Sequence, residues 1–157
     1  MLNILVLLLA TGLGLGFSPL ASGTVGTLIG VLIVLLMGFF HVNLAWQIVI
    51  AVILIVLAIP ICDKAEKFFG TKDDGRIVAD EYMTFPLCML GLPWSQNLWL
   101  LGLAFLSHRL FDIIKPPPAR QIQELHGGTG IVLDDVISSL YALALNHAVW
   151  AAYKWIY

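Results

Sequence analysis

The sequence has few charged residues. Asp, Glu, Lys and Arg make up only 11% of its 157 residues, whereas about 25% is usual for a soluble domain. Hydrophobic residues make up 60% of the chain, and the mean hydropathy is +0.95. The formal net charge is −2, so the chain lacks the positive excess that holds a nucleic-acid backbone. These proportions exclude an ordinary soluble domain, argue against DNA or RNA as a partner, and predict a membrane protein in a lipid bilayer.

Charge is absent from the first 62 residues, and 17 of the 18 charged side chains lie between Asp63 and Asp135. Cysteine is also scarce. Cys62 and Cys88 allow at most one bridge, so no disulfide framework is expected, and we interpret both as free buried thiols. The length fits a single membrane-embedded domain over residues 1–157.

Long apolar stretches are present and have the length of membrane spans, which need roughly 20 residues in a helix. Residues 44–61 form one span and residues 25–40 another, and the three-residue connection between them predicts an antiparallel hairpin. A last apolar helix is expected at residues 131–157, with Asp134 and Asp135 in its first turn and an aromatic belt near its end. The N-terminal apolar stretch at residues 2–16 is short for a span.

A further apolar stretch, residues 83–108, is interrupted at residues 93–97 and leaves two pieces too short for upright spans. Basic residues flank it on both sides: Lys64, Lys67, Lys72 and Arg76 before it, and Arg109, Lys115 and Arg120 at its end or beyond. The positive-inside rule places both polar segments in the cytoplasm, so the stretch is predicted to be a re-entrant or shallow hairpin. A single tilted span is the alternative and would put the two polar segments on opposite faces. The fold class predicted is all-α: a polytopic helical membrane protein with transmembrane helices plus half-length, re-entrant segments.

Five carboxylates stand beside apolar sequence in three separate clusters: Asp80 with Glu81, Asp112, and Asp134 with Asp135. An ionised group at membrane depth costs about 2.5–3.5 kcal/mol on insertion scales, and such groups are normally paired, hydrated or bound to a cation. Helix capping and local ion pairs are the alternative, but a contact with a helix dipole gains only about 0.3–1 kcal/mol. We therefore favour convergence of the three clusters on a divalent ion such as Mg²⁺, which prefers carboxylate oxygens and retained waters.

Two glycine-bearing stretches, residues 23–27 and 127–130, each precede an apolar helix. Backbone N–H groups at a helix start can bind phosphate, although glycine is also common wherever a chain turns. Lys115 is followed by three prolines, which end its helix and hold its ammonium at the interface. A fixed lysine beside carboxylates and glycine loops is typical of a phosphate and metal site. Asp73 and Asp74, between Lys72 and Arg76, are interpreted first as part of a solvated loop, with a metal role as the lesser alternative.

Together these residues resemble the phosphatidylglycerophosphatase A family of bacterial membrane lipid phosphatases. The similarity follows chain order over about three quarters of the sequence, through residues 16–19, 23–28, 77–81, 109–116 and 126–135. The resemblance implies a Mg²⁺-dependent enzyme of the bacterial cytoplasmic (inner) membrane. Such an enzyme removes the terminal phosphate of phosphatidylglycerophosphate to give phosphatidylglycerol, with its active site facing the cytoplasm. The family's acidic motif positions fall on Asp80, Glu81, Asp112, Asp134 and Asp135, and its polar positions on Thr24, Arg109 and Lys115.

From the resemblance and the residues we assign three expected roles. The metal ligands are Asp80, Glu81, Asp134 and Asp135. The catalytic set adds Asp112, as the group that orients or deprotonates the attacking water, and Lys115. The substrate-binding residues are Gly23, Thr24, Arg109, Lys115, Gly127 and Gly128.

Several alternatives remain open at the level of sequence. Phosphoryl transfer can proceed by direct attack of water or through an aspartyl-phosphate intermediate. A related phosphatase that acts on another lipid head group would carry the same residues. A small cation carrier using intramembrane acids is a third hypothesis, although its acids should be spread through the depth of the spans, and here they gather at segment ends. Neither the oligomeric state nor the number of metal ions follows from the sequence.

Overall fold

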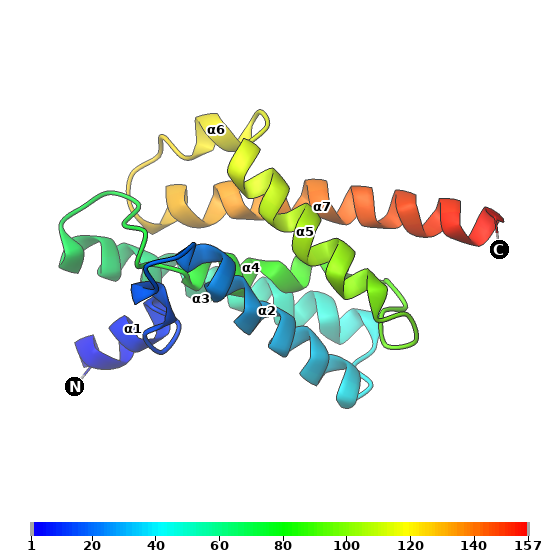
Figure 1. The fold of residues 1–157 in the computed structure, drawn as a ribbon. Coiled ribbons are helices and arrows are strands. Elements are labelled where there is room, and N and C mark those ends of the chain that lie inside the picture. Colours follow the sequence, from blue (N-terminus) through cyan, green and yellow to red (C-terminus); the bar gives the residue numbers. More distant parts are fainter. Residues whose placement is uncertain (1, 157) are drawn as a thin grey trace.

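A computed structural model describes residues 2–156, which contain helices and no strand. The elements in chain order are α1 (Leu2–Ala10), η1 (Leu15–Phe17), α2 (Ser22–Phe39), α3 (Leu44–Phe69), α4 (Ala79–Thr84), η2 (Phe85–Met89), α5 (Trp99–Ile114), α6 (Ala119–Ile122) and α7 (Gly128–Ile156). Among these, α2, α3 and α7 are long and apolar enough to cross a membrane. The three predicted spans and the all-α class are therefore confirmed (Figure 1).

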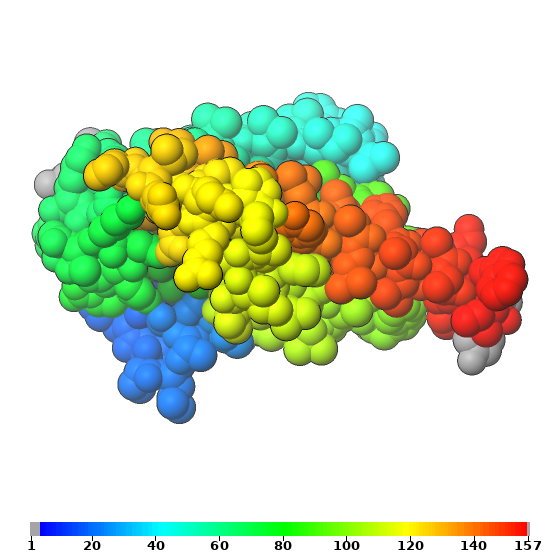
Figure 2. Space-filling view, turned by 90° about the horizontal axis from the view of Figure 1, so that it is seen from above, coloured from blue at the N-terminus to red at the C-terminus, as the bar shows by residue number. Residues whose placement is uncertain are grey.

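The first two spans form the predicted antiparallel hairpin. Asn43 is the N-cap of α3, and its side chain accepts a hydrogen bond from the backbone N–H of Trp46, which satisfies one of the free donors at a helix start. α3 carries Pro60 and continues to Phe69 beyond the predicted apolar span, so its last turns reach into the polar segment. The third span, α7, ends in a C-terminal part that projects past the rest of the bundle (Figure 2).

Between α3 and α7 the chain makes the predicted re-entrant hairpin. α4 and η2 run in one direction, and α5 returns in the other (Figure 1). Trp94, in the turn, packs against Gly38 at the far end of α2, and the N–H of Gly91 donates to Gln47 of α3 at 3.4 Å. An α-helix rises about 1.5 Å per residue, so the hairpin is not shallow: its turn lies level with the turn between α2 and α3.

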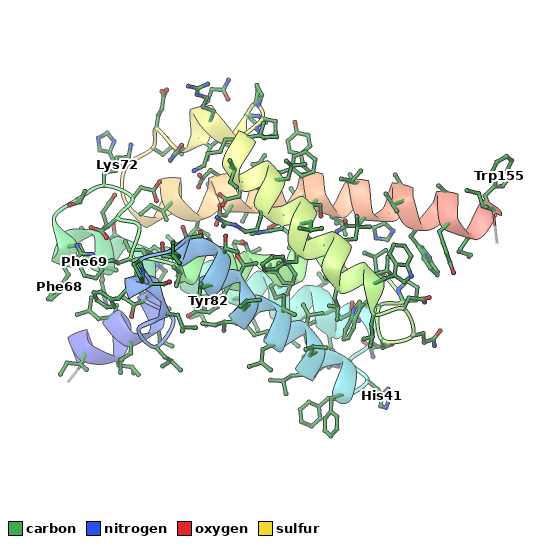
Figure 3. All side chains as sticks on the ribbon, in the orientation of Figure 1. His41, Phe68, Phe69, Lys72, Tyr82 and Trp155 are labelled. Atoms are coloured by element: carbon green, nitrogen blue, oxygen red, sulfur yellow. The ribbon has the colours of Figure 1, made fainter. Side chains whose placement is uncertain are left out.

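Both polar segments lie at one end of the bundle, as the positive-inside argument predicts. The ammonium of Lys72 donates to the carbonyl of Glu124 at 3.2 Å, and the Gln123 side chain donates to Asp73 at 2.8 Å. Figure 3 places Lys72 at this end of the molecule and His41, in the turn between α2 and α3, at the other. The single tilted span is therefore wrong, because it would separate the two polar segments.

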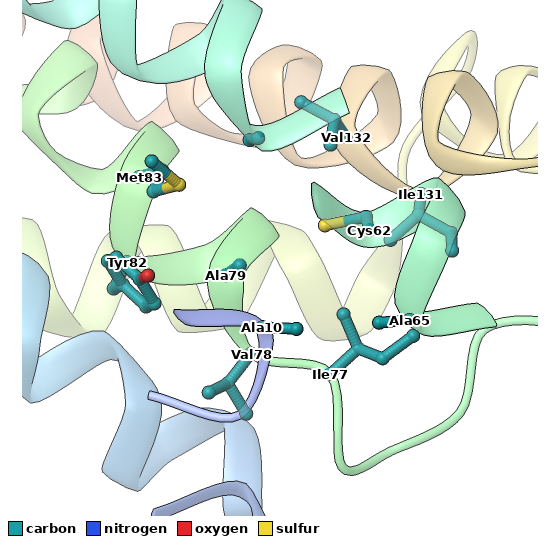
Figure 4. Close-up of a cluster of buried hydrophobic side chains, with 11 residues drawn as sticks. Ala10, Cys62, Ala65, Ile77, Val78, Ala79, Tyr82, Met83, Ile131 and Val132 are labelled. Atoms are coloured by element: carbon teal, nitrogen blue, oxygen red, sulfur yellow. The ribbon is translucent and has the colours of Figure 1, made fainter. Parts of the chain in front are cut away.

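The short helix α4 occupies the centre of the bundle, between α2, α3 and α7. Val78 and Ala79 are fully buried, and Tyr82 and Met83 are nearly so. These residues pack against apolar side chains of α3 and α7 (Figure 4). Gly26 of α2 permits this approach, because a Cβ there would overlap Val78. The packing fixes the start of α4, and hence Asp80 and Glu81, deep between three longer helices.

The start of α7 differs from the prediction. The helix begins at Gly128 rather than Ile131, so Asp134 and Asp135 lie in its second turn and not in its first. The cause is a contact with α3: the Asp63 side chain accepts a hydrogen bond from the Gly128 N–H. This contact begins the helix one turn earlier, because it satisfies an N–H that has no partner within α7.

Buried polar groups join the helices in the apolar interior. Asn146 of α7 accepts a hydrogen bond from the Ser107 hydroxyl of α5 at 2.9 Å and donates to the carbonyl of Cys88 at 3.1 Å. Ser139 donates to the carbonyl of Thr84 at 3.3 Å. Polar groups without water need internal partners, and these bonds hold the re-entrant hairpin against α7. Cys88 is a free buried thiol, as is Cys62, which confirms that interpretation.

Candidate active site

A cavity of about 390 Å³ opens at the polar end of the bundle. Carboxylates from α4, α5 and α7 line it together with two bases and the start of α2. The predicted site residues that line it are Gly23, Asp80, Glu81, Arg109, Asp112, Lys115, Asp134 and Asp135. The three acidic clusters, separate in sequence, therefore meet in one place.

Arg109 joins two of the acidic clusters. Its guanidinium donates to Glu81 Oε1 at 2.9 Å and to Asp112 Oδ2 at 2.6 Å. The second of these bonds links residues three apart on α5, which face the same side of a helix. The first crosses from α5 to α4 and holds the re-entrant hairpin closed at its polar end.

Lys115 reaches the third cluster. It caps the C-terminus of α5 in the left-handed region, with φ of 48°, and its ammonium lies 2.5 Å from Asp134 Oδ2. A residue with a Cβ seldom adopts a positive φ, and the prolines that follow stop the helix at this point. The helix ends at Lys115, as the three prolines predict, and the lysine side chain reaches Asp134 of α7.

The start of α2 closes the cavity on another side. Gly23 is buried against Glu81, and a Cβ at position 23 would overlap the Glu81 carboxylate. The Ser22 hydroxyl donates to the carbonyl of Gly75 at 2.6 Å, which ties α2 to the segment before α4. Thr24 is half-buried in the same turn but does not line the cavity.

Burial shapes the electrostatics of the site. Asp80 and Glu81 lie outside the three spanning helices, in the first turn of α4. Burial, followed by the neighbouring charge of Glu81, holds the pKa of Asp80 well above its usual range. Burial also raises the pKa of Glu81 to about 7, against the opposing effect of Arg109. Both shifts disfavour the ionised carboxylates, as expected where six acids and two bases share a buried cavity.

The carboxylates of the cavity have free oxygens that could bind a divalent cation, but they do not form a preformed cage. Four buried carboxylate oxygens have no hydrogen-bond partner: Asp80 Oδ1, Glu81 Oε2, Asp134 Oδ1 and Asp135 Oδ2. Over residues 2–156, however, no three acidic, histidine or cysteine side chains are already gathered tightly enough to enclose a metal ion. Mg²⁺ does not require such a cage, because it keeps several waters and is usually bound through one or two carboxylates and substrate phosphate. The unpartnered oxygens are consistent with that mode of binding.

Gly127 and Gly128, predicted to bind substrate, lie elsewhere. Gly127 lines a separate cavity with His126 and Lys67, and Gly128 packs against the backbone of Ile59 in α3. The N–H of Gly128 donates to Asp63, so a protein carboxylate occupies the position that the sequence suggested for phosphate. The structure does not bring these two glycines to the acidic cavity.

Sequence reasoning placed Asp73 in a solvated loop, whereas the structure places it at the wall of the acidic cavity. Its φ is 50°, and two other cavity residues, Ala21 and Lys115, also combine a Cβ with a positive φ. Such strained positions cluster at functional sites. Ile113 also lines the cavity and is 72% exposed, so an apolar residue stands at an open side of the cavity. Neither feature is visible in the sequence, because each depends on how distant segments pack.

Fold and cavity together define a helical membrane protein with a cavity of six carboxylates and two bases at one end of the bundle. The sequence model of the phosphatidylglycerophosphatase A family matches residues 8–150. A phosphatidylglycerophosphatase A of Escherichia coli is 33% identical over 90% of this chain and 81% of its own length, and one of Haemophilus influenzae is 34% identical over 90% and 86%. A Bacteroides thetaiotaomicron protein with the provisional name phosphatidylinositol-3-phosphatase is 34% identical over 91% and 92%. No solved structure matches the chain.

The chain therefore belongs to the phosphatidylglycerophosphatase A family, and it is a phosphatase. Its acids gather at one end of the bundle around two bases. That placement agrees with an enzyme and not with a cation carrier, whose acids would be spread through the depth of the spans.

Proposed function

We propose that this protein hydrolyses the terminal phosphate of phosphatidylglycerophosphate to give phosphatidylglycerol and inorganic phosphate, in a reaction that depends on Mg²⁺. The observation that carries the proposal is the meeting of acids from α4, α5 and α7 with Arg109 and Lys115 in one cavity. The family supports the substrate, since two relatives are named for it. The place of action is the cytoplasmic side of the bacterial inner membrane, because the cavity lies at the end that carries the basic segments.

The two bases bind the phosphoryl group. Arg109 and Lys115 both line the cavity and point charged N–H donors into it. Charge-assisted hydrogen bonds to phosphate oxygens are roughly twice as strong as neutral ones, and donors fixed in advance stabilise charge that develops in the transition state. Each base also pairs with a carboxylate, which holds it in position before substrate arrives.

Asp80, Glu81, Asp134 and Asp135 would hold Mg²⁺, because their buried oxygens lack other partners. A bound Mg²⁺ supplies Lewis-acid polarisation of the phosphoryl group and a lower pKa for coordinated water. Asp112 is the residue for orienting or deprotonating the attacking water, since it lines the cavity beside Arg109 and lies within reach of a phosphoryl group bound there.

An aspartyl-phosphate route uses the same residues in a different order. Rapid acid quench of a single turnover with phosphate-labelled substrate separates it from direct attack. Direct attack gives no trapped phosphoenzyme. A phosphoenzyme caught by rapid acid quench would establish the covalent route.

The acyl chains remain in lipid during the reaction. A cavity of about 390 Å³ holds a head group but not a diacyl lipid. Ile113 and Ile114, near the mouth, have side chains that are 72% and 60% exposed, as apolar side chains facing hydrocarbon would be. The lipid therefore enters sideways over the end of α5, with its phosphate directed toward Arg109 and Lys115.

The direct test is phosphate release by the purified protein in detergent, with phosphatidylglycerophosphate and phosphatidylinositol 3-phosphate compared with and without Mg²⁺. The second lipid is included because one relative carries the provisional name phosphatidylinositol-3-phosphatase. We expect hydrolysis of phosphatidylglycerophosphate in Mg²⁺ and none in excess chelator. Preference for the inositol lipid would contradict the substrate assignment and leave the phosphatase chemistry standing.

A further inference from the structure

Asp73 has a position that a solvated loop residue would not have. It lies in the segment between α3 and α4, and its side chain lines the acidic cavity. Its backbone N–H donates to Glu66 Oε1 at 3.2 Å, and its Oδ2 accepts a hydrogen bond from the Gln123 side chain at 2.8 Å. These two bonds fix a residue whose φ is 50°, a value that residues with a Cβ seldom adopt.

The charge balance of the cavity shows what such a residue can do. Six carboxylates line the cavity, and the bases that line it are Arg109 and Lys115. Within residues 2–156, Asp73, Asp80 and Asp135 form no salt bridge. One oxygen of Asp80 and one of Asp135 are buried without any hydrogen-bond partner. Buried carboxyl groups without a protein partner are either protonated or bound to a metal ion, and a cation in this cavity would give both Asp80 and Asp135 a partner.

Asp73 also marks the water side of the cavity. A second cavity of about 440 Å³ adjoins the first, and its walls are Lys72, Asp73, Arg120, Gln123 and Glu124. Lys72, Arg120 and Glu124 are exposed, so this second cavity belongs to the aqueous surface. Asp73 is common to both cavities. Asp73 therefore lies between the aqueous surface and the buried carboxylates.

We propose that Asp73 is a further ligand of the divalent cation, directly or through a retained water, on the side of the acidic cavity that faces the aqueous surface. The inference rests on the cation dependence stated under the proposed function. It adds to the site a residue from the segment before α4. The Asp73–Gln123 hydrogen bond joins this residue to the segment between α6 and α7.

The test measures cation binding without turnover. Mn²⁺ is titrated into the purified full-length protein in detergent, and its binding is followed by electron paramagnetic resonance in the absence of lipid substrate. Asp73→Asn removes the charge but tolerates a positive φ and still accepts a hydrogen bond from Gln123. Asp73→Glu restores the charge. The matched control is Glu124→Gln, which removes one acid from the same polar end but outside the acidic cavity.

We expect Asp73→Asn to weaken Mn²⁺ binding about 10–100-fold, with Asp73→Glu recovering part of the affinity and Glu124→Gln matching the wild type. Wild-type affinity in Asp73→Asn would overturn the proposal. Equal weakening in the Asn and Glu variants would also overturn it, because that result assigns Asp73 a structural role. If Asp73→Asn does not fold, Gln123→Met is the second variant. It keeps every charge but removes the hydrogen bond that holds the Asp73 carboxylate. Unchanged Mn²⁺ affinity in Gln123→Met would count against the proposal.

The outcomes also separate this proposal from the proposed function. A wild-type protein that binds no Mn²⁺ yet hydrolyses lipid removes both the Asp73 proposal and the Mg²⁺ dependence, while the phosphatase assignment stands. If the protein binds Mn²⁺ through Asp73 but does not hydrolyse phosphatidylglycerophosphate, only the substrate assignment is wrong.

Discussion

The ammonium of Lys115 lies 2.5 Å from Asp134 Oδ2, which joins the C-terminal cap of α5 to the second turn of α7. Lys115 is one of the two bases that line the cavity, and its backbone adopts the left-handed conformation. The first prediction concerns this residue.

Lys115→Met removes a positive charge from the cavity and leaves Asp134, which is 2% exposed, without its partner. We expect phosphate release to fall about 100–1,000-fold, the usual effect of losing one fixed donor to a developing negative charge. The control is Lys154→Met near the end of α7, far from the cavity, which should retain wild-type turnover. Equal activity of the two variants would show that Lys115 does not contact substrate.

The contact between Gly23 and Glu81 gives a steric prediction. Gly23→Ala places a Cβ against the Glu81 carboxylate, whereas Gly102→Ala in α5 meets nothing within 4 Å. We expect the first change to displace Glu81 and to lower turnover about tenfold or more, since misplacement by about 1 Å can cost 100-fold. Gly102→Ala should be silent. If both variants turn over substrate normally, the start of α2 is not part of the site.

Sideways entry of the lipid predicts a difference between long and short substrates. Ile113→Trp narrows the mouth of the cavity, and the control Leu106→Trp changes an exposed residue of the same helix away from the mouth. We expect Ile113→Trp to raise KM for a long-chain lipid about tenfold while leaving KM for a soluble dihexanoyl analogue unchanged, because one extra bulky group in an apolar passage costs 1–3 kcal/mol. An equal rise for both substrates would mean that Ile113 affects the cavity itself and not the passage of acyl chains.

The buried bonds of Asn146 predict a loss of stability without a direct effect on chemistry. Asn146→Leu removes the side-chain donor to the Cys88 carbonyl and leaves the Ser107 hydroxyl with the Ala104 carbonyl as its partner, and an orphaned buried group costs about 1–3 kcal/mol. The midpoint of thermal unfolding in detergent should fall by several degrees, at about 2–4 °C per kcal/mol. Gln121→Leu on exposed α6 is the control. An unchanged midpoint in Asn146→Leu would show that the hydrogen bonds of Asn146 do not stabilise the packing of α7.

Much of the fold follows from the sequence because apolar length is a property of local segments. The hairpin of α2 and α3 and the long α7 were predicted from it, and the charges at both ends of the re-entrant stretch placed those ends together. Asp80, Asp112 and Asp134 were predicted to meet because each stands at the edge of an apolar segment and carries a motif of the family. The structure confirms that they share a cavity.

The remainder depends on contacts between distant segments. Nothing near Gly128 shows that its N–H donates to Asp63 of α3, so the glycine loop looked like a phosphate site. Asp73 looked solvated because its neighbours in sequence are charged, whereas its bonds to Glu66 and to Gln123, fifty residues away, hold it at the cavity. Pairings of this kind are set by the packing of whole helices and are not encoded by a local pattern.

The central claim is that acids from separate helices act together with Mg²⁺ on a lipid phosphate. The most direct measurement is phosphate release from phosphatidylglycerophosphate by wild type, Asp80→Asn and Asp134→Asn across a Mg²⁺ titration. We predict that chelator abolishes wild-type turnover and that each variant loses about 100-fold or more, since each carries a buried oxygen without another partner. Turnover that survives chelation, or normal activity in both variants, would contradict the account.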